Sequence, residues 1–303
     1  MPPLERDYPV EGPLDLRRTL RSMLMWGGST WMRIDDSGAW YARRCKAGPA
    51  TVQLRRRDRF LVARSWGDGS DELLDSVPDL CGLGNQGLAD VVPQSPRVRD
   101  MLLGVQGYRQ ARSGQVLPQL VCTALGQKVT GKNSSGAIRR IAYWWGEKPP
   151  GPRDDLRILP LPRDLERRPY YEYSRLGIER KRADLVRRIA SRSHAMQRAA
   201  KMPFAEARAH LEKLPGIGPW TSGVVMGGVL GDPDAVPIGD YHLPNYVGWT
   251  LAREPRATDQ RMMELLEPYA GHRGMVARAV KVGGDTPPKW GPRMTPQDLR
   301  DLS

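Results

Sequence analysis

The sequence predicts an α+β protein, in which a small N-terminal antiparallel β-sheet domain with helices precedes a mainly α-helical domain. The chain has 303 residues, of which 40% are hydrophobic and 27% charged, which fits a globular protein of about two domains. Short apolar segments separated by turns fill its first part, and helical periodicity dominates after a Pro-containing stretch at 92–96. We expect an α+β domain over 1–93, a helical domain over 94–284 and a poorly ordered tail over 285–303.

The N-terminal domain is predicted to begin with a helix and to continue as a sheet. Asp15 can cap this helix, and a second helix is expected over 70–77. Four apolar positions of the first helix follow helical spacing, namely Leu16, Leu20, Met23 and Leu24. Turn-forming residues separate four segments that we expect to be strands, at 30–34, 39–45, 51–57 and 59–66.

Helices are expected to make up the second domain. The segment 117–145 is apolar along one side, but Gly126, Gly131 and Gly136 within it indicate two helices with a break. Further helices are predicted from their apolar spacing at 182–191, 204–214, 258–269 and 273–282.

Charge and cysteine content narrow the class of protein. Lys and Arg number 47 against 34 for Asp and Glu, giving a net charge of +13, which favours a polyanionic partner unless the arginines only solvate the surface. Three scattered cysteines, without a CxxC pair, argue against a disulfide framework, a zinc site or a four-cysteine iron–sulfur cluster. Without a secretory signal or a membrane-length apolar run, we expect a soluble cytoplasmic protein.

The most informative segment is LEKLPGIGPWTS at 211–222. It predicts a helix, a glycine turn and a second helix, a helix-hairpin-helix motif. Gly216 and Gly218 tolerate positive φ and carry no side chain, so the backbone can approach another molecule closely. Pro219 suits the first turn of the second helix, whose unpaired amides can bind a phosphate. The hairpin can therefore grip a DNA backbone without reading sequence, although an ordinary helix-turn-helix corner would have a similar pattern.

The stretch that follows resembles a known family. VPIGDY at 236–241 places Asp240 twenty positions after Trp220, and this order resembles the helix-hairpin-helix DNA glycosylases, most closely 3-methyladenine DNA glycosylase II. LVCTALGQ at 120–127 and LGIERKRA at 176–183 are similar to further segments of that enzyme. The resemblance covers roughly 14–283 and is specific between 211 and 240.

The resemblance implies a role for each matching residue. Asp240 would be the catalytic carboxylate, and Trp220, Val224 and Tyr241 would line the pocket for a flipped base. The residues expected to bind the DNA backbone are Leu214, Pro215, Gly216, Ile217, Gly218, Thr221, Gln127 and Lys128. No cofactor is required, but the main-chain carbonyls of Glu212, Leu214 and Ile217 would hold a monovalent cation, Na or K, as a structural element of the hairpin.

This chain departs from the family pattern at four positions. Lys128 stands where the alkylbase enzyme has a leucine wedge, and Val224 replaces a second pocket aromatic residue. Pro244 indicates that the helix after Asp240 starts nearer Leu243. Trp220 occupies the position of the Schiff-base lysine of bifunctional members, so the resemblance implies a monofunctional enzyme without lyase activity.

The implied function is base-excision repair of damaged, alkylated bases in double-stranded DNA by a monomeric enzyme that flips the base out and hydrolyses its N-glycosidic bond. The principal alternative is a non-catalytic DNA-binding protein that uses the hairpin as a phosphate clamp and Asp240 as a helix cap. An unrelated enzyme with a coincidental glycine corner is the third alternative. The sequence contains no nucleotide-binding glycine loop, zinc motif or Ser-His-Asp string to support it.

Overall fold

The computed structural model describes residues 2–23, 29–85 and 87–288. Most of the predicted tail, from 289 to 303, and Leu24 of the first predicted helix lie outside the described residues. Within the described ranges, no helix is long and apolar enough to cross a membrane.

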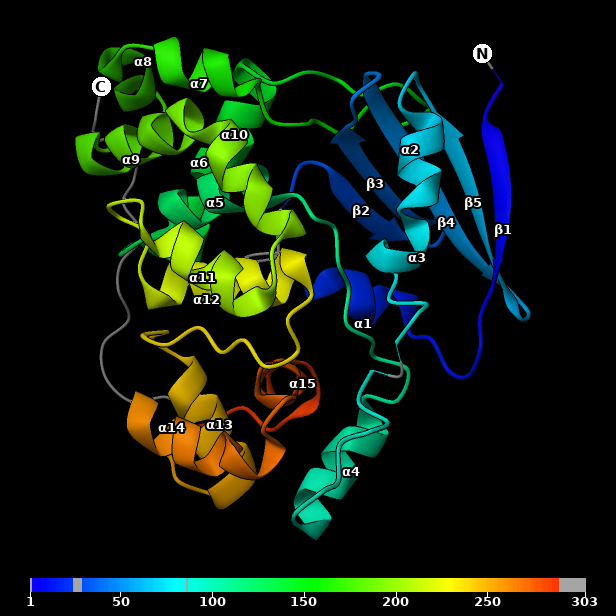
Figure 1. The fold of residues 1–303 in the computed structure, drawn as a ribbon, viewed down its shortest axis with the longest axis vertical. Coiled ribbons are helices and arrows are strands. Elements are labelled where there is room, and N and C mark those ends of the chain that lie inside the picture. Colours follow the sequence, from blue (N-terminus) through cyan, green and yellow to red (C-terminus); the bar gives the residue numbers. More distant parts are fainter. Residues whose placement is uncertain (1, 24–28, 86, 289–303) are drawn as a thin grey trace.

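A five-stranded antiparallel sheet forms the N-terminal part, in the order β1-β5-β4-β3-β2 (Figure 1). Its presence beside a helical remainder confirms the predicted α+β fold class. All four strand segments expected from the sequence are present, and the edge strand β1 adds to them. The strands are β1 Leu4–Pro9, β2 Met32–Asp35, β3 Gly38–Arg44, β4 Pro49–Arg57 and β5 Phe60–Trp66.

The two faces of the sheet are covered differently because successive side chains of a strand point in opposite directions. Helix α2 (Ser70–Asp75) lies over one face, where Val52 and Leu54 of β4 are fully buried (Figure 1). On the opposite face, Trp40 and Trp66 stack with their ring centroids 5.6 Å apart. This stack belongs to a small apolar cluster with the segment after α6, which joins the sheet to the helical part.

The first predicted helix and the break in the long apolar segment are both confirmed. The Arg18 amide donates to the Asp15 side chain at 2.9 Å, so Asp15 caps helix α1 (Leu16–Arg21). The segment around 117–145 forms α5 (Val116–Gly126) and α6 (Gly131–Trp144), with the Thr130 side chain capping the second helix. The expected helix at 70–77 is divided into α2 and the short α3 (Val77–Leu80).

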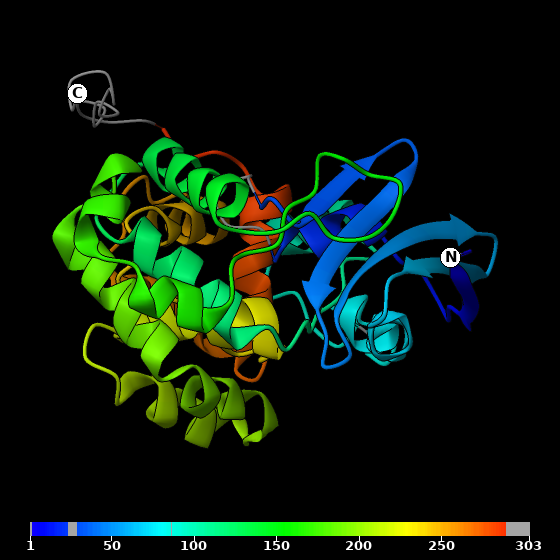
Figure 2. The same cartoon turned by 90° about the horizontal axis from the view of Figure 1, so that it is seen from above.

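The helices pack around two separate apolar cores, whose elements lie apart in Figure 1, and Figure 2 shows the helical part beside the sheet. One core joins α5 and α6 to α7 Pro162–Arg167, α8 Tyr170–Arg175, α9 Arg180–Ser191, α10 Ser193–Gln197, the 3-10 helix η1 Arg198–Lys201, α11 Phe204–Glu212, α12 Pro219–Val225 and the π-helix η2 Met226–Leu230. The other joins α4 Pro96–Gly104, α13 Leu243–Ala252, α14 Asp259–Leu266, the 3-10 helix η3 Glu267–Tyr269 and α15 Arg273–Gly283. Helix α4 therefore packs with elements far from it in sequence, and the domain boundary at 93 stays a prediction.

Candidate active site and nucleic-acid interface

The predicted hairpin connects α11 to α12. Leu214 and Ile217 are 8% and 4% exposed and anchor the turn in the helical core. The Ile217 amide donates to the Leu214 carbonyl at 3.0 Å, which closes the turn. Pro219 is the first residue of α12, as its missing amide hydrogen favours. Between these anchors, Pro215 and Gly216 are exposed at the surface of the molecule.

The two hairpin glycines differ in the reason for their presence. Gly216 has φ +101°, in the left-handed region, and a Cβ there would lie 2.7 Å from the Leu185 Cδ1 atom. Gly218 has φ −109°, and a Cβ built on it meets nothing within 4 Å. The tolerance of a positive φ is therefore needed at Gly216, whereas at Gly218 the missing side chain leaves open space in front of the backbone.

Two side chains from other helices hold the hairpin in place. Gln127, at the end of α5, donates from Nε2 to the Gly216 carbonyl at 2.9 Å and to the Thr221 hydroxyl at 3.2 Å. Arg188 of α9 donates from Nη1 to the Pro215 carbonyl at 2.8 Å. Thr221 is only 2% exposed, so this hydroxyl supports the hairpin through Gln127 rather than at the surface.

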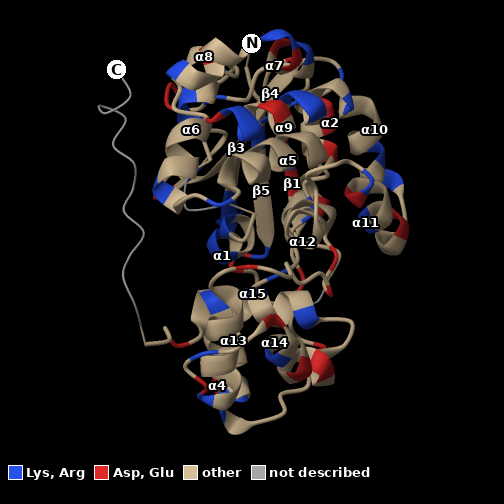
Figure 3. Ribbon diagram, turned by 90° about the vertical axis from the view of Figure 1, so that its left-hand side faces the viewer, with Lys and Arg blue, Asp and Glu red and all other residues tan. Residues whose placement is uncertain are grey.

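Basic residues near the hairpin include Lys213 at the end of α11, Lys128 after α5 and Arg188 of α9. Lys128 follows Gln127 directly, is exposed and has a left-handed φ of +57°. Figure 3 shows further Lys and Arg on α9, the helix that supplies Arg188. Sequence reasoning missed Arg188, because its place in a run of basic helical residues does not indicate which loop it contacts.

Asp240 lies at the entry to α13, and its carboxylate accepts three hydrogen bonds. Oδ1 accepts the His242 amide at 3.0 Å and the Leu243 amide at 2.8 Å, and Oδ2 accepts the Trp220 indole Nε1–H at 3.1 Å. The helix begins at Leu243, as Pro244 predicted. The preceding Gly239 has φ +89°, which suits the sharp turn before the aspartate.

These contacts keep the carboxylate ionised. Partial burial raises the pKa of Asp240, but the positive charge of Lys281 on α15, the two amides and the Trp220 indole favour the charged form, and the pKa is lowered overall. Lys281 is a second residue that sequence reasoning missed, because α15 is brought beside Asp240 only by tertiary packing. Asp240 is therefore a half-buried, oriented anion at neutral pH.

The residues expected to line a base pocket occupy different environments. Trp220 and Val224 lie one turn apart on α12 and are both half-buried. Tyr241 is 87% exposed and packs edge-on against His242, with ring centroids 4.8 Å apart. Trp220 is thus joined directly to Asp240 by a hydrogen bond, a contact that the sequence spacing alone did not indicate.

The hairpin can be compared with the chemistry of the expected cation. Its donors would be the neutral main-chain oxygens of Glu212, Leu214 and Ile217, and the Leu214 carbonyl also accepts the Ile217 amide. Neutral oxygens at a tight turn fit a monovalent ion better than a divalent metal. No group of three His, Cys, Asp or Glu side chains that could hold a metal occurs in the part of the chain that the structure describes.

Comparisons of sequence find relatives over part of the chain, although no family model matches it. A protein of Mycobacterium tuberculosis described as "Probable bifunctional transcriptional activator/DNA repair enzyme AlkA" is 27% identical over 162 residues, which are 52% of this chain and 32% of that protein. A DNA-3-methyladenine glycosylase of Bacillus subtilis is 31% identical over 85 residues, 28% of each chain. The matches thus span about a third of the length of these relatives or less.

Comparisons of structure cover almost the whole chain. The 3-methyladenine DNA glycosylase from Archaeoglobus fulgidus aligns with a TM-score of 0.78 and 14% identity, over 91% of this chain and 96% of the other. The Clostridium acetobutylicum 8-oxoguanine glycosylase/lyase in complex with DNA aligns with a TM-score of 0.67 and 13% identity, over 86% and 89%. The chain therefore has the fold of the helix-hairpin-helix DNA glycosylase superfamily, and its sequence resembles the 3-methyladenine DNA glycosylases within it.

Proposed function

We propose that this protein is a monofunctional DNA glycosylase that removes damaged, alkylated bases from double-stranded DNA, with Asp240 as its catalytic carboxylate. The observation that carries the proposal is the environment of Asp240. It is a half-buried anion, oriented by the amides of His242 and Leu243 and by the Trp220 indole, on the segment that follows the hairpin helix α12. The activity and the 3-methyladenine specificity of the relatives support it by analogy.

The carboxylate suits the chemistry of base removal. Breaking the N-glycosidic bond leaves positive charge on the deoxyribose, and a fixed anion beside the sugar stabilises that charge in the transition state. Because Asp240 is already ionised and oriented, it needs no reorganisation during the reaction. The same carboxylate can orient and deprotonate the attacking water. An alkylated purine is cationic and leaves readily, so no strong general acid is required.

The hairpin would hold the DNA while the base is turned out. The open space at Gly218 lets a phosphate approach the backbone, while Gln127 and Arg188 keep the turn rigid. Lys128 would lie beside the gap that the flipped base leaves in the DNA base stack, as a basic residue in place of an apolar wedge. Flipping costs less for a damaged pair than for an intact one, so a pocket formed with Trp220 and Val224 can be loosely selective.

The monofunctional assignment depends on Trp220. A lyase needs an amine to form a Schiff base with the sugar, and an indole cannot do so. The amine of Lys281 is close enough to influence the charge of Asp240, so it is the lysine to check. Borohydride should trap no covalent adduct with lesion DNA, and a stable adduct mapped to any lysine, Lys281 included, would overturn this part of the proposal.

The phosphate-clamp alternative also has a specific observation in its favour. Two backbone amides at the start of α13 donate to Asp240 Oδ1, which is what a helix cap does. A cap alone does not explain the third contact, in which the indole of α12 holds Oδ2. The clamp predicts DNA binding without base release.

The proposal is tested by incubating the protein with duplexes that each carry one lesion, alkylated purines together with oxidised and deaminated bases, and counting abasic sites. We expect release from alkylated purines in preference to the other lesions. Tight DNA binding without release from any duplex would favour the clamp and contradict the proposal.

A further inference from the structure

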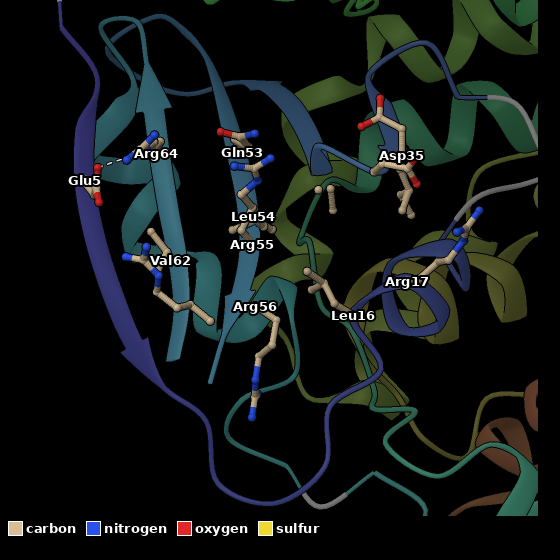
Figure 4. Close-up of a pocket in the computed structure, with 15 residues that line it drawn as sticks. Glu5, Leu16, Arg17, Asp35, Gln53, Leu54, Arg55, Arg56, Val62 and Arg64 are labelled. Atoms are coloured by element: carbon tan, nitrogen blue, oxygen red, sulfur yellow. Dashed lines mark hydrogen bonds and ion pairs between the residues drawn. The ribbon is translucent and has the colours of Figure 1, made fainter. Parts of the chain in front are cut away.

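A groove of about 530 Å³ lies on the N-terminal sheet, apart from Asp240 and the hairpin. Its walls come from the end of β4, the neighbouring strands and helix α1. Five arginines line it, and Figure 4 labels four of them: Arg55 and Arg64 lie on the neighbouring strands β4 and β5, Arg56 points away from these two, and Arg17 lies on α1. Arg57 follows at the end of β4. The groove therefore gathers guanidinium groups from three separate elements.

Two of these guanidinium groups are fixed by the backbone. Arg55 donates from Nε to the Ser37 carbonyl at 2.6 Å, and Arg56 donates from Nε to the Asp58 carbonyl at 2.6 Å. Among the described residues, no acceptor is hydrogen-bonded to Nη1 or Nη2 of either arginine. Each therefore presents an oriented pair of donors, the geometry with which arginine binds a phosphate in bidentate fashion.

The acidic residues of the groove leave most of this charge unpaired. Of the three acidic residues that line the groove, Glu5 pairs with Arg64 at 2.8 Å, and Asp35 is bound by Ser37 and by Arg153 from outside the groove. The third, Asp36, is exposed and forms no ion pair with another described residue. Arg17 and Arg57 are exposed and form no ion pair with any other described residue. Alternate residues of a strand lie about 7 Å apart on one face, so Arg55 and Arg57 can contact neighbouring phosphates of one strand.

The end of the groove that carries Arg55, Arg56 and Arg57 lies away from the hairpin. In Figure 1 the turn between β4 and β5, next to these arginines, is on the far side of the sheet from α11 and α12, whereas α1, which supplies Arg17, lies between the sheet and the helical part. The charge of the groove is therefore not needed to explain the hairpin.

We propose that this arginine groove is a second, non-catalytic binding site for the phosphate backbone of duplex DNA, so that one protein molecule can hold two DNA segments at once. The proposal relies on the proposed function only for the choice of DNA as the polyanion. It does not require Asp240 to be catalytic. A second segment held at the groove would keep the protein on DNA while the hairpin releases one site and samples another.

The test is a bridging measurement with the full chain. An immobilised duplex is saturated with protein, and capture of a second, fluorescent duplex is followed over a range of salt concentrations. The test variant is Arg17→Glu combined with Arg57→Glu, since both side chains are exposed. The matched control is Arg97→Glu combined with Arg99→Glu, which makes the same charge change on exposed positions of α4.

We expect the native protein and the control to capture the second duplex, and the test variant to weaken that capture by roughly tenfold or more. Base release by the test variant should stay within about twofold of native, because the hairpin is unchanged. Capture of no second duplex by the native protein would overturn the proposal, as would equal capture by native protein and test variant. Preferential binding of polyglutamate at the groove would also overturn it, in favour of an acidic protein. Absence of base release would count against the proposed function alone.

Discussion

The two hairpin glycines provide a sharp test of how the hairpin works, because the structure gives them different roles. In Gly216→Ala, the new side chain must adopt φ near +101° and lie against Leu185. A left-handed non-glycine residue costs about 1–2 kcal/mol, and displacing the flexible Leu185 side chain adds a smaller cost. We therefore expect a loss of about 1–3 kcal/mol in the free energy of unfolding.

Gly218→Ala is the matched control for stability. At φ −109°, with nothing within 4 Å of the new Cβ, alanine adds no strain and restricts the unfolded chain, so stability should be unchanged or rise by less than about 1 kcal/mol. The same methyl group stands in the space through which a phosphate would approach. We expect affinity for duplex DNA to fall by roughly tenfold or more, equivalent to losing one or two charge-assisted hydrogen bonds.

Urea unfolding and fluorescence anisotropy with a labelled duplex measure both quantities on the same preparations. Equal stability of the two variants would refute the strain assigned to Gly216. If Gly218→Ala binds DNA with native affinity, the claim that a phosphate contacts the open backbone at Gly218 would be refuted.

Three further predictions follow from the site. Trp220→Phe removes the indole donor to Asp240 Oδ2, so the pKa of Asp240 should rise. Because the ionised form is the active one, the acid limb of the pH profile of the excision rate should move to higher pH. An acid limb at the native pH would argue against this hydrogen bond. Gln127→Ala leaves the Gly216 carbonyl and the buried Thr221 hydroxyl without their donor, and should lower the free energy of unfolding by about 1–2 kcal/mol. Unchanged stability in urea would show that the hairpin does not depend on the Gln127 side chain. The logarithm of the DNA-binding constant should fall with the logarithm of salt concentration at roughly −0.9 per phosphate, with about four to eight phosphates neutralised, and a flat salt response would contradict an electrostatic interface.

The sequence predicted those elements whose signals are local. The Asp15 cap, the strands bounded by turn residues, the break between α5 and α6 and the late start of α13 each depend on residues within a few positions of one another. Strand β1 gave no such signal: its segment LERDYP is mostly polar, and it becomes a strand only because it pairs with β5 at the sheet edge. Helix α4 begins at Pro96, inside a stretch whose proline content was typical of a linker.

The same distinction applies to the site. The spacing of the motif predicted the hairpin and placed Asp240 after it, and its resemblance to the family is the basis for the expectation that Trp220 stands where bifunctional enzymes have a lysine. The bond between Trp220 and Asp240, and the support of Gly216 by Gln127, join segments 20 and 89 positions apart in sequence. Such contacts depend on how the helices pack against one another, which a local sequence pattern does not predict.

Asp240→Asn tests the central claim most directly, because it removes the charge while leaving an oxygen that can still accept the amides of α13. We expect single-turnover excision to slow by a hundred- to several-thousand-fold, corresponding to about 3–5 kcal/mol of barrier. Affinity for lesion DNA should be unchanged or higher, since a carboxylate is removed beside a polyanion. The loss of stability should be about 1–2 kcal/mol, because the Asn side chain cannot accept both the amides of α13 and the Trp220 indole. Excision at a near-native rate, or a loss of activity that the melting temperature fully explains by unfolding, would contradict the assignment of Asp240 as the catalytic carboxylate.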